Sequence, residues 1–351
     1  MDKPPIDILS LTSGQFLEQA AARGIGAPQA LAVYRRTFRE NDPRPVAWIA
    51  MPQQTVINSR REDQTIKFTQ RLEDGLETEA VILRQQGRTG RARTSLCVSS
   101  QVGCALGCTF CETGQMGLRR SLGASEIIAQ FLAAQHDFHA PITNVLFMGM
   151  GEPLDNLPAV IGAVGVLAGR NGPAIAPARI SISTAGRIVG IARLAELVRK
   201  PGFHRLRLAV SLNAPNDDIR SRIMPINRVE PMSRLMEALR RWPCRDRSRI
   251  LIEYVLIPGV NDDPRHADEL CAFLRPLRCT VNVVPYNPRL DSPWPAPRED
   301  QVQRFVDRII ANRQFVKRRR TMGRSVMGAC GQLGNRRLRP SPLAGPGRTP
   351  R

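Results

Sequence analysis

The chain has 351 residues, and 42% of them are apolar, the proportion expected of a folded protein with one large domain and room for a small companion. The longest nearly unbroken apolar run, residues 159–169, is interrupted by glycine and is too short to cross a bilayer. The first ten residues lack the apolar segment of a secretory signal. We therefore expect a soluble, cytoplasmic protein that makes no contact with membranes.

The charge balance predicts partners rather than a fold. The chain contains 51 Lys and Arg residues against 31 Asp and Glu, which gives a formal net charge of +20. A polyanion such as RNA would release counterions when it binds so many cations, so RNA is the expected partner. A GC-rich genome also favours arginine, and the charge excess alone does not separate the two explanations.

Residues 1–45 are predicted to form a small helical module. We expect helices over residues 15–22 and 28–39, with a glycine-containing turn at residues 23–26 and a proline-containing break at residues 41–43. Two helices joined by such a turn either contact the backbone of RNA or form a plain helical hairpin, and the pattern fits both.

Residues 46–93 are predicted to hold a β-hairpin and a basic linker. Alternating apolar and polar runs at residues 65–68 and 79–83 flank an Asp-Gly turn at residues 73–75. The arginine-rich stretch 84–93 is expected to be the linker to the next domain.

Between residues 94 and 316, short β-branched runs alternate with amphipathic stretches. The expected strands are residues 95–99, 144–148, 179–183, 205–212, 250–256 and 280–284. The expected helices are residues 125–135, 157–168, 189–199, 232–241, 267–274 and 299–312. Six successive β-α units imply a parallel sheet with helices outside it, either doubly wound or closed into an incomplete barrel. In both architectures, functional residues gather at the carboxyl ends of the strands.

The last segment, residues 317–351, contains ten Lys or Arg residues and no acid. It includes Cys330, and its end from residue 336 is rich in Pro, Gly and Arg. That composition is typical of disorder.

The most specific signal is the C-x3-C-x2-C spacing of Cys104, Cys108 and Cys111, directly after the first strand of the repeat. A 4Fe-4S cluster normally takes four cysteine ligands. Three therefore leave one iron open to a substrate or cofactor. The alternative is zinc, which also prefers four ligands and usually takes them in C-x2-C pairs.

The wider pattern resembles the radical S-adenosylmethionine superfamily and, within it, the RlmN/Cfr family of RNA adenine methyltransferases. The matching runs are CVSSQVGCALGC at residues 97–108, TGQMG at 113–117, MGMGEP at 148–153, STAG at 183–186, APND at 214–217, PIN at 225–227, IEYV at 252–255 and GACGQL at 328–333. The resemblance implies an incomplete (β/α)6 TIM-type barrel as the core.

Site residues follow from this resemblance one position at a time. Cys104, Cys108 and Cys111 would hold the 4Fe-4S cluster. The positions implied to contact S-adenosylmethionine are Gly151, Glu152, Ser183, Ser211, Leu212, Asn213 and Asn287.

The resemblance also implies a reaction that consumes two molecules of S-adenosylmethionine per turnover. Cys330 takes a methyl group from the first. The second yields a deoxyadenosyl radical that abstracts hydrogen from this methyl group, and the carbon radical then adds to carbon 2 or carbon 8 of an adenine. Cys97 releases the product through a transient disulfide with Cys330, and Glu79 accepts a proton. Glu77 shares the strand face of Glu79 and fits that role equally well.

Two departures from the family pattern concern the site. The family usually has Ser-Leu-His where this chain has Ser211, Leu212 and Asn213, and it usually carries acidic residues just before the position of Cys330. Both departures bear on the RNA target more than on the reaction type.

The implied substrate is 23S rRNA, with tRNA as a second one, and the implied electron donor is a protein such as flavodoxin or ferredoxin. The chain is expected to be a monomer. Two alternatives stay open: a radical enzyme with another substrate, which has no need of Cys97 and Cys330, and a non-catalytic zinc protein that binds RNA.

Overall fold

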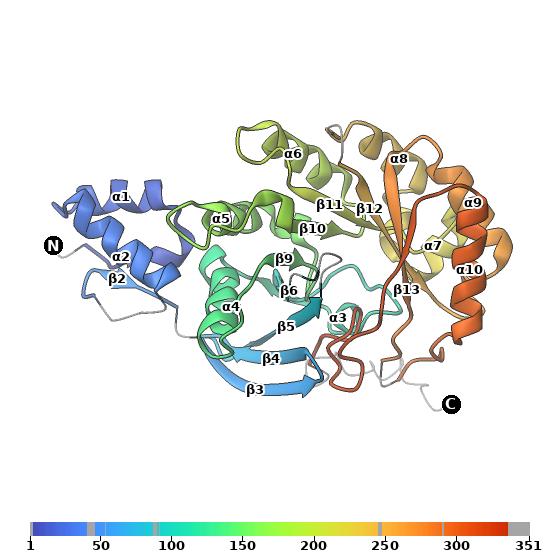
Figure 1. Cartoon of the computed structure of the whole chain (residues 1–351), viewed down its shortest axis with the longest axis horizontal. Coiled ribbons are helices and arrows are strands. Elements are labelled where there is room, and N and C mark those ends of the chain that lie inside the picture. Colours follow the sequence, from blue (N-terminus) through green and yellow to red (C-terminus); the bar gives the residue numbers. More distant parts are fainter. Residues whose placement is uncertain are drawn as a thin grey trace, which may run out of the picture.

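The computed structural model describes residues 3–40, 46–52, 54–86, 90, 92–244, 248–289 and 291–335. Its parallel strands are β6 (Ala92–Cys97), β9 (Asn144–Phe147), β10 (Ile180–Thr184), β11 (Arg207–Ser211), β12 (Ile250–Leu256), β13 (Cys279–Pro285) and β14 (Val316–Arg318). They pair in this order across one sheet, as Figure 1 shows. All six strands predicted from the sequence are confirmed, and β14 adds a short seventh.

Six helices cover the outer face of these strands. They are α4 (Ala124–His136), α5 (Leu157–Ala168), α6 (Ile188–Arg199), α8 (Met232–Arg240), α9 (Pro264–Leu274) and α10 (Glu299–Ala311). All six were predicted. Elements that are too short to show a period were missed: α3 (Glu112–Gln115), α7 (Asp217–Ile223), β7 (Gln101–Gly103), β8 (Leu118–Ser121) and the 3-10 turns η1 (Ile8–Ser10), η2 (Pro153–Asn156), η3 (Pro177–Arg179) and η4 (Pro225–Arg228).

Strand β12 shows how the sheet separates its two faces. Ile252 and Tyr254 are buried against the helices, and the ring of Tyr254 stacks on Phe305 of α10 with 5.2 Å between centroids. Glu253 and Val255, which alternate with them, are half-buried on the opposite, inner face. This inner face encloses the interior of an incomplete barrel, the architecture expected from the resemblance.

Three antiparallel strands extend the sheet beyond β6: β3 (Thr55–Glu62), β4 (Thr65–Arg71) and β5 (Glu77–Gln86). The predicted hairpin is present, with Gly75 at φ +81° in its turn. The basic stretch 84–93 is not the linker we predicted, because β5 continues to Gln86 and pairs there with Ala92 of β6. Arg84 and Arg93 lie on these paired strands and are half-buried, although the stretch has the composition of a linker. Strand β3 was missed because it is a polar edge strand.

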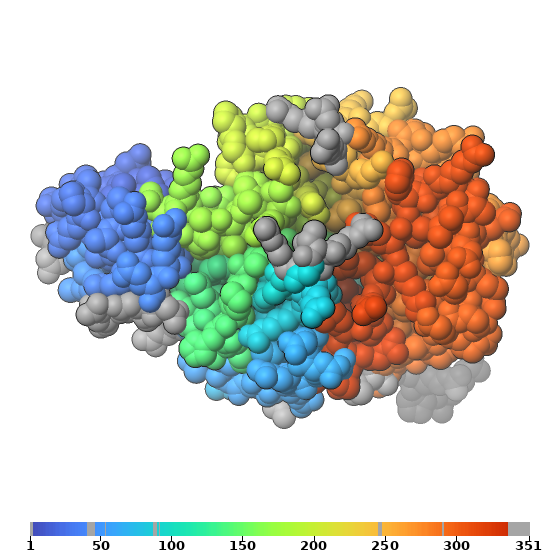
Figure 2. Space-filling view, in the orientation of Figure 1, coloured from blue at the N-terminus to red at the C-terminus, as the bar shows by residue number. Residues whose placement is uncertain are grey.

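The amino-terminal module contains the two predicted helices, α1 (Ser13–Ala21) and α2 (Ala27–Arg39). It also contains a two-stranded pairing of β1 (Ile6–Asp7) with β2 (Ile49–Ala50). Figure 2 shows the module as a lobe at one end of the molecule. It shares one apolar core with the barrel, to which Phe16 and Tyr34 belong, and it also makes polar contacts such as Arg35 Nη2 to Asn171 Oδ1 at 3.0 Å. The predicted break at residues 41–43 and the tail from residue 336 lie outside the described residues, and the domain boundaries stay predictions.

Within the described part of the chain, no helix has the length and apolar character needed to span a membrane.

Candidate active site

The three clustered cysteines lie in the loop between β7 and α3, and glycines fix the shape of this loop. The backbone N–H of Cys104 donates to the carbonyl of Gly117 at 3.1 Å. Gly103 has φ +79°, and a Cβ there would lie 1.8 Å from the same carbonyl oxygen. A Cβ on Gly114 would lie 2.9 Å from the backbone nitrogen of Cys108. The backbone approaches are therefore too close for any residue except glycine.

The thiols of Cys104, Cys108 and Cys111 are half-buried against apolar side chains that include Leu106 and Phe110. Burial raises the pKa of all three, that of Cys104 to about 12, and the charges of the other two thiolates raise the pKa of Cys108 further. A bound metal centre would reverse these shifts, because its positive charge favours the thiolate. Soft thiolate donors in an apolar loop fit an iron-sulfur cluster.

The zinc alternative requires several donors around one ion. Among the described residues, no group of three His, Cys, Asp or Glu side chains could hold a single ion in this way. The cysteines of a 4Fe-4S cluster each bind a different iron and need only surround the cluster, so the geometry gives zinc no support.

A buried arginine joins the cluster loop to the strand ends, and the sequence analysis missed it. Arg220 of α7 is fully buried, and its guanidinium donates to the carbonyls of Leu212 and Ala185 and to Asn227 Oδ1. Burial lowers its pKa to about 10, while the charge of a Cys108 thiolate raises it. Arg220 therefore holds the loops that follow β10 and β11 and places a positive charge near Cys108.

Glu152 follows β9 and is 3% exposed. Its carboxylate accepts from the backbone N–H of Leu154 at 3.0 Å and of Ala185 at 2.8 Å, and burial raises its pKa to about 7. Its charge also raises the pKa of Cys104, so the carboxylate lies near the cluster loop. The neighbouring Gly151 has φ +95°, and a Cβ there would lie 2.5 Å from the Cβ of Gln101.

The other implied cofactor contacts lie at the ends of β10 and β11. Ser183 and Ser211 are half-buried, whereas Leu212 is buried. Asn213 has φ +58°, in the left-handed region that asparagine tolerates better than most residues. Its Oδ1 accepts from the backbone N–H of Val255 at 2.9 Å. In this chain the amide therefore ties the end of β11 to β12.

Residues 322–335 form a segment, here called the Cys330 segment, that returns to the cluster loop. The backbone N–H of Glu112 in α3 donates to the carbonyl of Gly331 at 2.7 Å. On the other side, Gln332 Nε2 donates to the carbonyl of Pro288 at 2.8 Å, and Asn287 Nδ2 donates to the carbonyl of Cys330 at 3.5 Å. The segment thus bridges the cluster loop and the loop after β13.

Cys97 and Cys330 come from opposite ends of the domain and lie near each other. The charge of Cys330 raises the pKa of Cys97, after the larger effect of burial. The pKa of Cys330 is raised as well, mainly because its sulfur is desolvated, and a Cys111 thiolate adds to the rise. Cys330 is exposed and Cys97 is half-buried, and both are free thiols. The structure thus contains no disulfide between them.

Glu79 of β5 lies under the Cys330 segment. Its Oε1 is 2.7 Å from Lys67 Nζ, and its Oε2 accepts from the backbone N–H of Gly334 at 2.8 Å. Burial raises the pKa of Glu79, and the charge of Lys67 opposes that shift. The competing candidate, Glu77, binds Asn335 at 2.9 Å and is less buried. Glu79 is therefore the more buried of the two carboxylates, and the residue that it binds, Gly334, precedes the residue bound by Glu77.

Comparisons with known proteins agree with this site. Residues 98–271 match the family model of the radical SAM superfamily. A dual-specificity RNA methyltransferase RlmN from Syntrophobacter fumaroxidans is 38% identical over 92% of both chains, and one from Campylobacter jejuni is 38% identical over 81% of this chain and 82% of its own. The chain belongs to the RlmN family. The crystal structure of a radical SAM methyltransferase from Sphaerobacter thermophilus, at 35% identity, covers 93% of this chain and 99% of its own with a TM-score of 0.85.

Membership of the RlmN family confirms several expectations from the sequence: a transferase with radical S-adenosylmethionine chemistry, and therefore S-adenosylmethionine and a 4Fe-4S cluster as cofactors. The roles of individual residues stay predictions. The sequence did not reveal the supporting roles of Lys67 and Arg220. Neither residue belongs to a motif, and both act through contacts with other segments of the chain.

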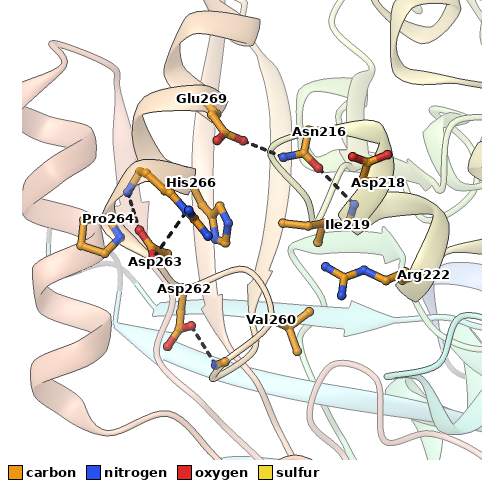
Figure 3. A pocket seen from close by; sticks show the side chains of 12 residues that line it. Asn216, Asp218, Ile219, Arg222, Val260, Asp262, Asp263, Pro264, His266 and Glu269 are labelled. Carbon is orange, nitrogen blue, oxygen red and sulfur yellow. Dashed lines mark hydrogen bonds and ion pairs between the residues drawn. The ribbon is translucent and has the colours of Figure 1, made fainter.

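The RlmN-family chain also has a concave surface outside this site. A pocket of about 600 Å³ lies between α7, the loop after β12 and the start of α9. Figure 3 shows the side chains that line it. Several of its side chains bind neighbouring groups: Asn216 Nδ2 donates to Glu269 at 2.6 Å, and Asp262 accepts from the backbone N–H of Gly259 at 2.8 Å. None of the site residues predicted from the sequence lines this pocket.

Proposed function

We propose that this chain transfers a methyl-derived carbon from S-adenosylmethionine to carbon 2 or carbon 8 of an adenine in 23S rRNA or tRNA. The proposal uses two molecules of S-adenosylmethionine per turnover. The observation that carries it is the convergence of Cys330, Cys97 and Glu79, far apart in the sequence, beside the cysteine loop. A radical enzyme with another substrate has no need of that convergence.

In this proposal, Cys104, Cys108 and Cys111 would hold the cluster and leave one iron for S-adenosylmethionine. The cluster would supply the electron for reductive cleavage of that cofactor. Glu152, which follows β9, accepts hydrogen bonds from the ammonium group of the methionine moiety. The remaining contacts with the cofactor are assigned to Gly151, Ser183, Ser211, Leu212, Asn213 and Asn287. The radical route is needed because carbon 2 of adenine is too weak an acid and nucleophile for polar methylation.

Cys330 is the methyl carrier. Its exposure on a segment bound to both the cluster loop and the loop after β13 suits a thiol that receives a methyl group and then meets the base. After the carbon joins the adenine, Glu79 accepts the proton from the ring carbon, and the unpaired electron left on the adduct would pass to the oxidised cluster. The Cys97 thiolate then attacks the sulfur of Cys330, which forms the S–S bond and breaks the S–C bond, and the released carbon takes up a proton to become the methyl group of the base. External reductant restores both thiols.

The proposed partners follow from the family and from the charge of the chain. RNA is the substrate, a small acidic electron-transfer protein such as flavodoxin or ferredoxin supplies electrons, and the chain works as a monomer in the cytoplasm.

The test is anaerobic turnover with the reconstituted protein, transcribed rRNA and tRNA fragments, and S-adenosylmethionine with a deuterated methyl group. Mass spectrometry of the nucleosides should show methyladenosine that carries the label. The Cys330→Ala variant should form none, while Cys271→Ala, which removes a buried thiol of α9, should retain activity. Methyladenosine formed by Cys330→Ala would overturn the methyl-carrier role.

A further inference from the structure

Three arginines lie at the amino-terminal ends of barrel strands, opposite the cluster loop: Arg93 is in β6, Arg207 begins β11, and Arg179 ends η3 immediately before β10. A fourth, Arg319, follows the carboxyl end of β14. The backbone N–H of Arg319 donates to the carbonyl of Val283 at 2.8 Å, which continues the pairing of β14 with β13.

Strand alternation turns three of these side chains, those of Arg93, Arg207 and Arg319, to the inner face, whereas Arg179 is the last residue of the 3-10 turn η3. Arg93 shares a face with Ser95 and Cys97 of β6, and Arg207 shares one with Ser211 of β11. Lys317 pairs with Asn282 of β13, which itself pairs with Glu253 of β12. Asn282 Nδ2 donates to Glu253 at 2.7 Å, so this row faces inward, and Arg319 lies two residues beyond Lys317 on the same face.

The four positive charges are close enough to oppose one another. Burial and then the charges of Arg319, Arg207 and Arg179 lower the pKa of Arg93. None of the four forms an ion pair with an acid in the part of the chain that the structure describes. Arginines elsewhere on the surface, such as Arg308 with Asp268 at 2.7 Å, do find acids. Like charges gathered without a counter-charge are unfavourable unless an anion binds among them.

This group of arginines reaches the proposed reaction centre. Burial raises the pKa of Glu253 and of Cys330, and the charge of Arg319 opposes the rise in both, so its guanidinium lies within electrostatic range of both. A ligand held by the arginines would thus lie beside the thiol that is proposed to meet the base.

We propose that Arg93, Arg179, Arg207 and Arg319 bind backbone phosphates of the RNA next to the adenine that is presented to Cys330. This inference rests on the proposed function. Four guanidinium groups exceed what the single carboxylate of S-adenosylmethionine requires, whereas successive phosphates of one strand match them in charge and in their bidentate hydrogen bonding. The contacts carry no base information, and they fix the register of the strand.

The test compares Arg207→Gln and Arg179→Gln with Arg193→Gln, which removes the same charge from an exposed position on α6. Each inner variant should weaken binding of the RNA substrate about ten-fold, the effect of losing a charged hydrogen bond. The slope of log affinity against log salt should fall by about 0.7 for each lost phosphate contact with a single strand. Affinity for S-adenosylmethionine and methylation of Cys330 without RNA should stay at the wild-type level.

Three results would overturn the inference. RNA affinity and salt slope equal to those of Arg193→Gln would show that the arginines do not bind the strand. Reduced affinity for S-adenosylmethionine would assign them to the cofactor instead. If inorganic phosphate at millimolar concentration displaced the bound RNA as effectively as competing RNA does, the arginines would be assigned to a small anion. Failure of the proposed function differs from all three, because the wild-type protein itself would then leave RNA unmethylated.

Discussion

The cluster loop and the Cys330 segment meet at the same site, but different contacts hold them. Backbone hydrogen bonds hold the cluster loop, such as Thr109 N–H to the carbonyl of Ile223 at 3.0 Å, together with glycines that no other residue can replace. Charged side chains of β3–β5 hold the Cys330 segment: Glu62 binds Gly323, Lys67 binds Met327, and Glu79 binds Gly334. Ligands of a cluster must stay fixed, whereas the proposed methyl carrier meets three reaction partners in turn.

The largest effect is expected from the loss of a cysteine in the cluster loop. Cys108→Ala should abolish assembly of the 4Fe-4S cluster, because the two remaining thiolates leave two irons without a protein ligand. Iron and sulfide analysis after anaerobic reconstitution measures the loss, with Cys271→Ala as the control that keeps full iron content. A stoichiometric cluster in Cys108→Ala would contradict the assignment of the ligands.

The second effect concerns the support behind the cluster loop. Arg220→Met removes a buried guanidinium and leaves the carbonyls of Ala185 and Leu212 without their donor, which should cost about 3 kcal/mol of stability. Urea unfolding checks this value. Arg222→Met, at an exposed position of the same helix, should change stability by less than about 0.5 kcal/mol. Equal effects of the two substitutions would show that Arg220 supports nothing.

The third effect concerns the ion pair between Lys67 and Glu79 beneath the Cys330 segment. The charge of Lys67 lowers the pKa of Glu79 against the effect of burial, so Lys67→Met should raise that pKa. Proton acceptance needs the ionised carboxylate, so the acidic limb of the pH–rate profile should move to higher pH, while Lys67→Arg keeps the wild-type profile. Identical profiles for Lys67→Met and Lys67→Arg would contradict this role.

The smallest effect is expected at the amino-terminal end of the Cys330 segment, residues 323–325. The carboxylate of Glu62 accepts from the hydroxyl of Ser325 and from the backbone N–H of Gly323 at 2.9 Å and of Ser325 at 2.6 Å, and these bonds, that of the hydroxyl above all, lower its pKa. Glu62→Gln should speed hydrogen exchange at residues 323–325 and leave exchange in the cluster loop unchanged. Faster exchange in both regions would show that one set of contacts holds them together.

Much of this molecule follows from its sequence, and the exceptions share a physical cause. Strands such as β12 and helices such as α10 bury a periodic apolar face, which their sequences display. The cysteine spacing and the final GACGQL run identified the site chemistry by resemblance. Strand β3 escaped because an exposed edge strand has no apolar face, and residues 84–93 were misassigned because charge masked their pairing. Lys67 and Arg220 escaped because their contacts join segments that only the fold brings together.

The central claim is that Cys330 carries the methyl group and Cys97 releases the product. The most direct test incubates Cys97→Ala anaerobically with RNA, S-adenosylmethionine and reductant, and then measures the denatured protein by mass spectrometry. The account predicts a covalent adduct between Cys330 and RNA through one carbon, absent from Cys271→Ala and from Cys97→Ala without S-adenosylmethionine. Free methylated RNA at the wild-type rate, with no adduct, would contradict it.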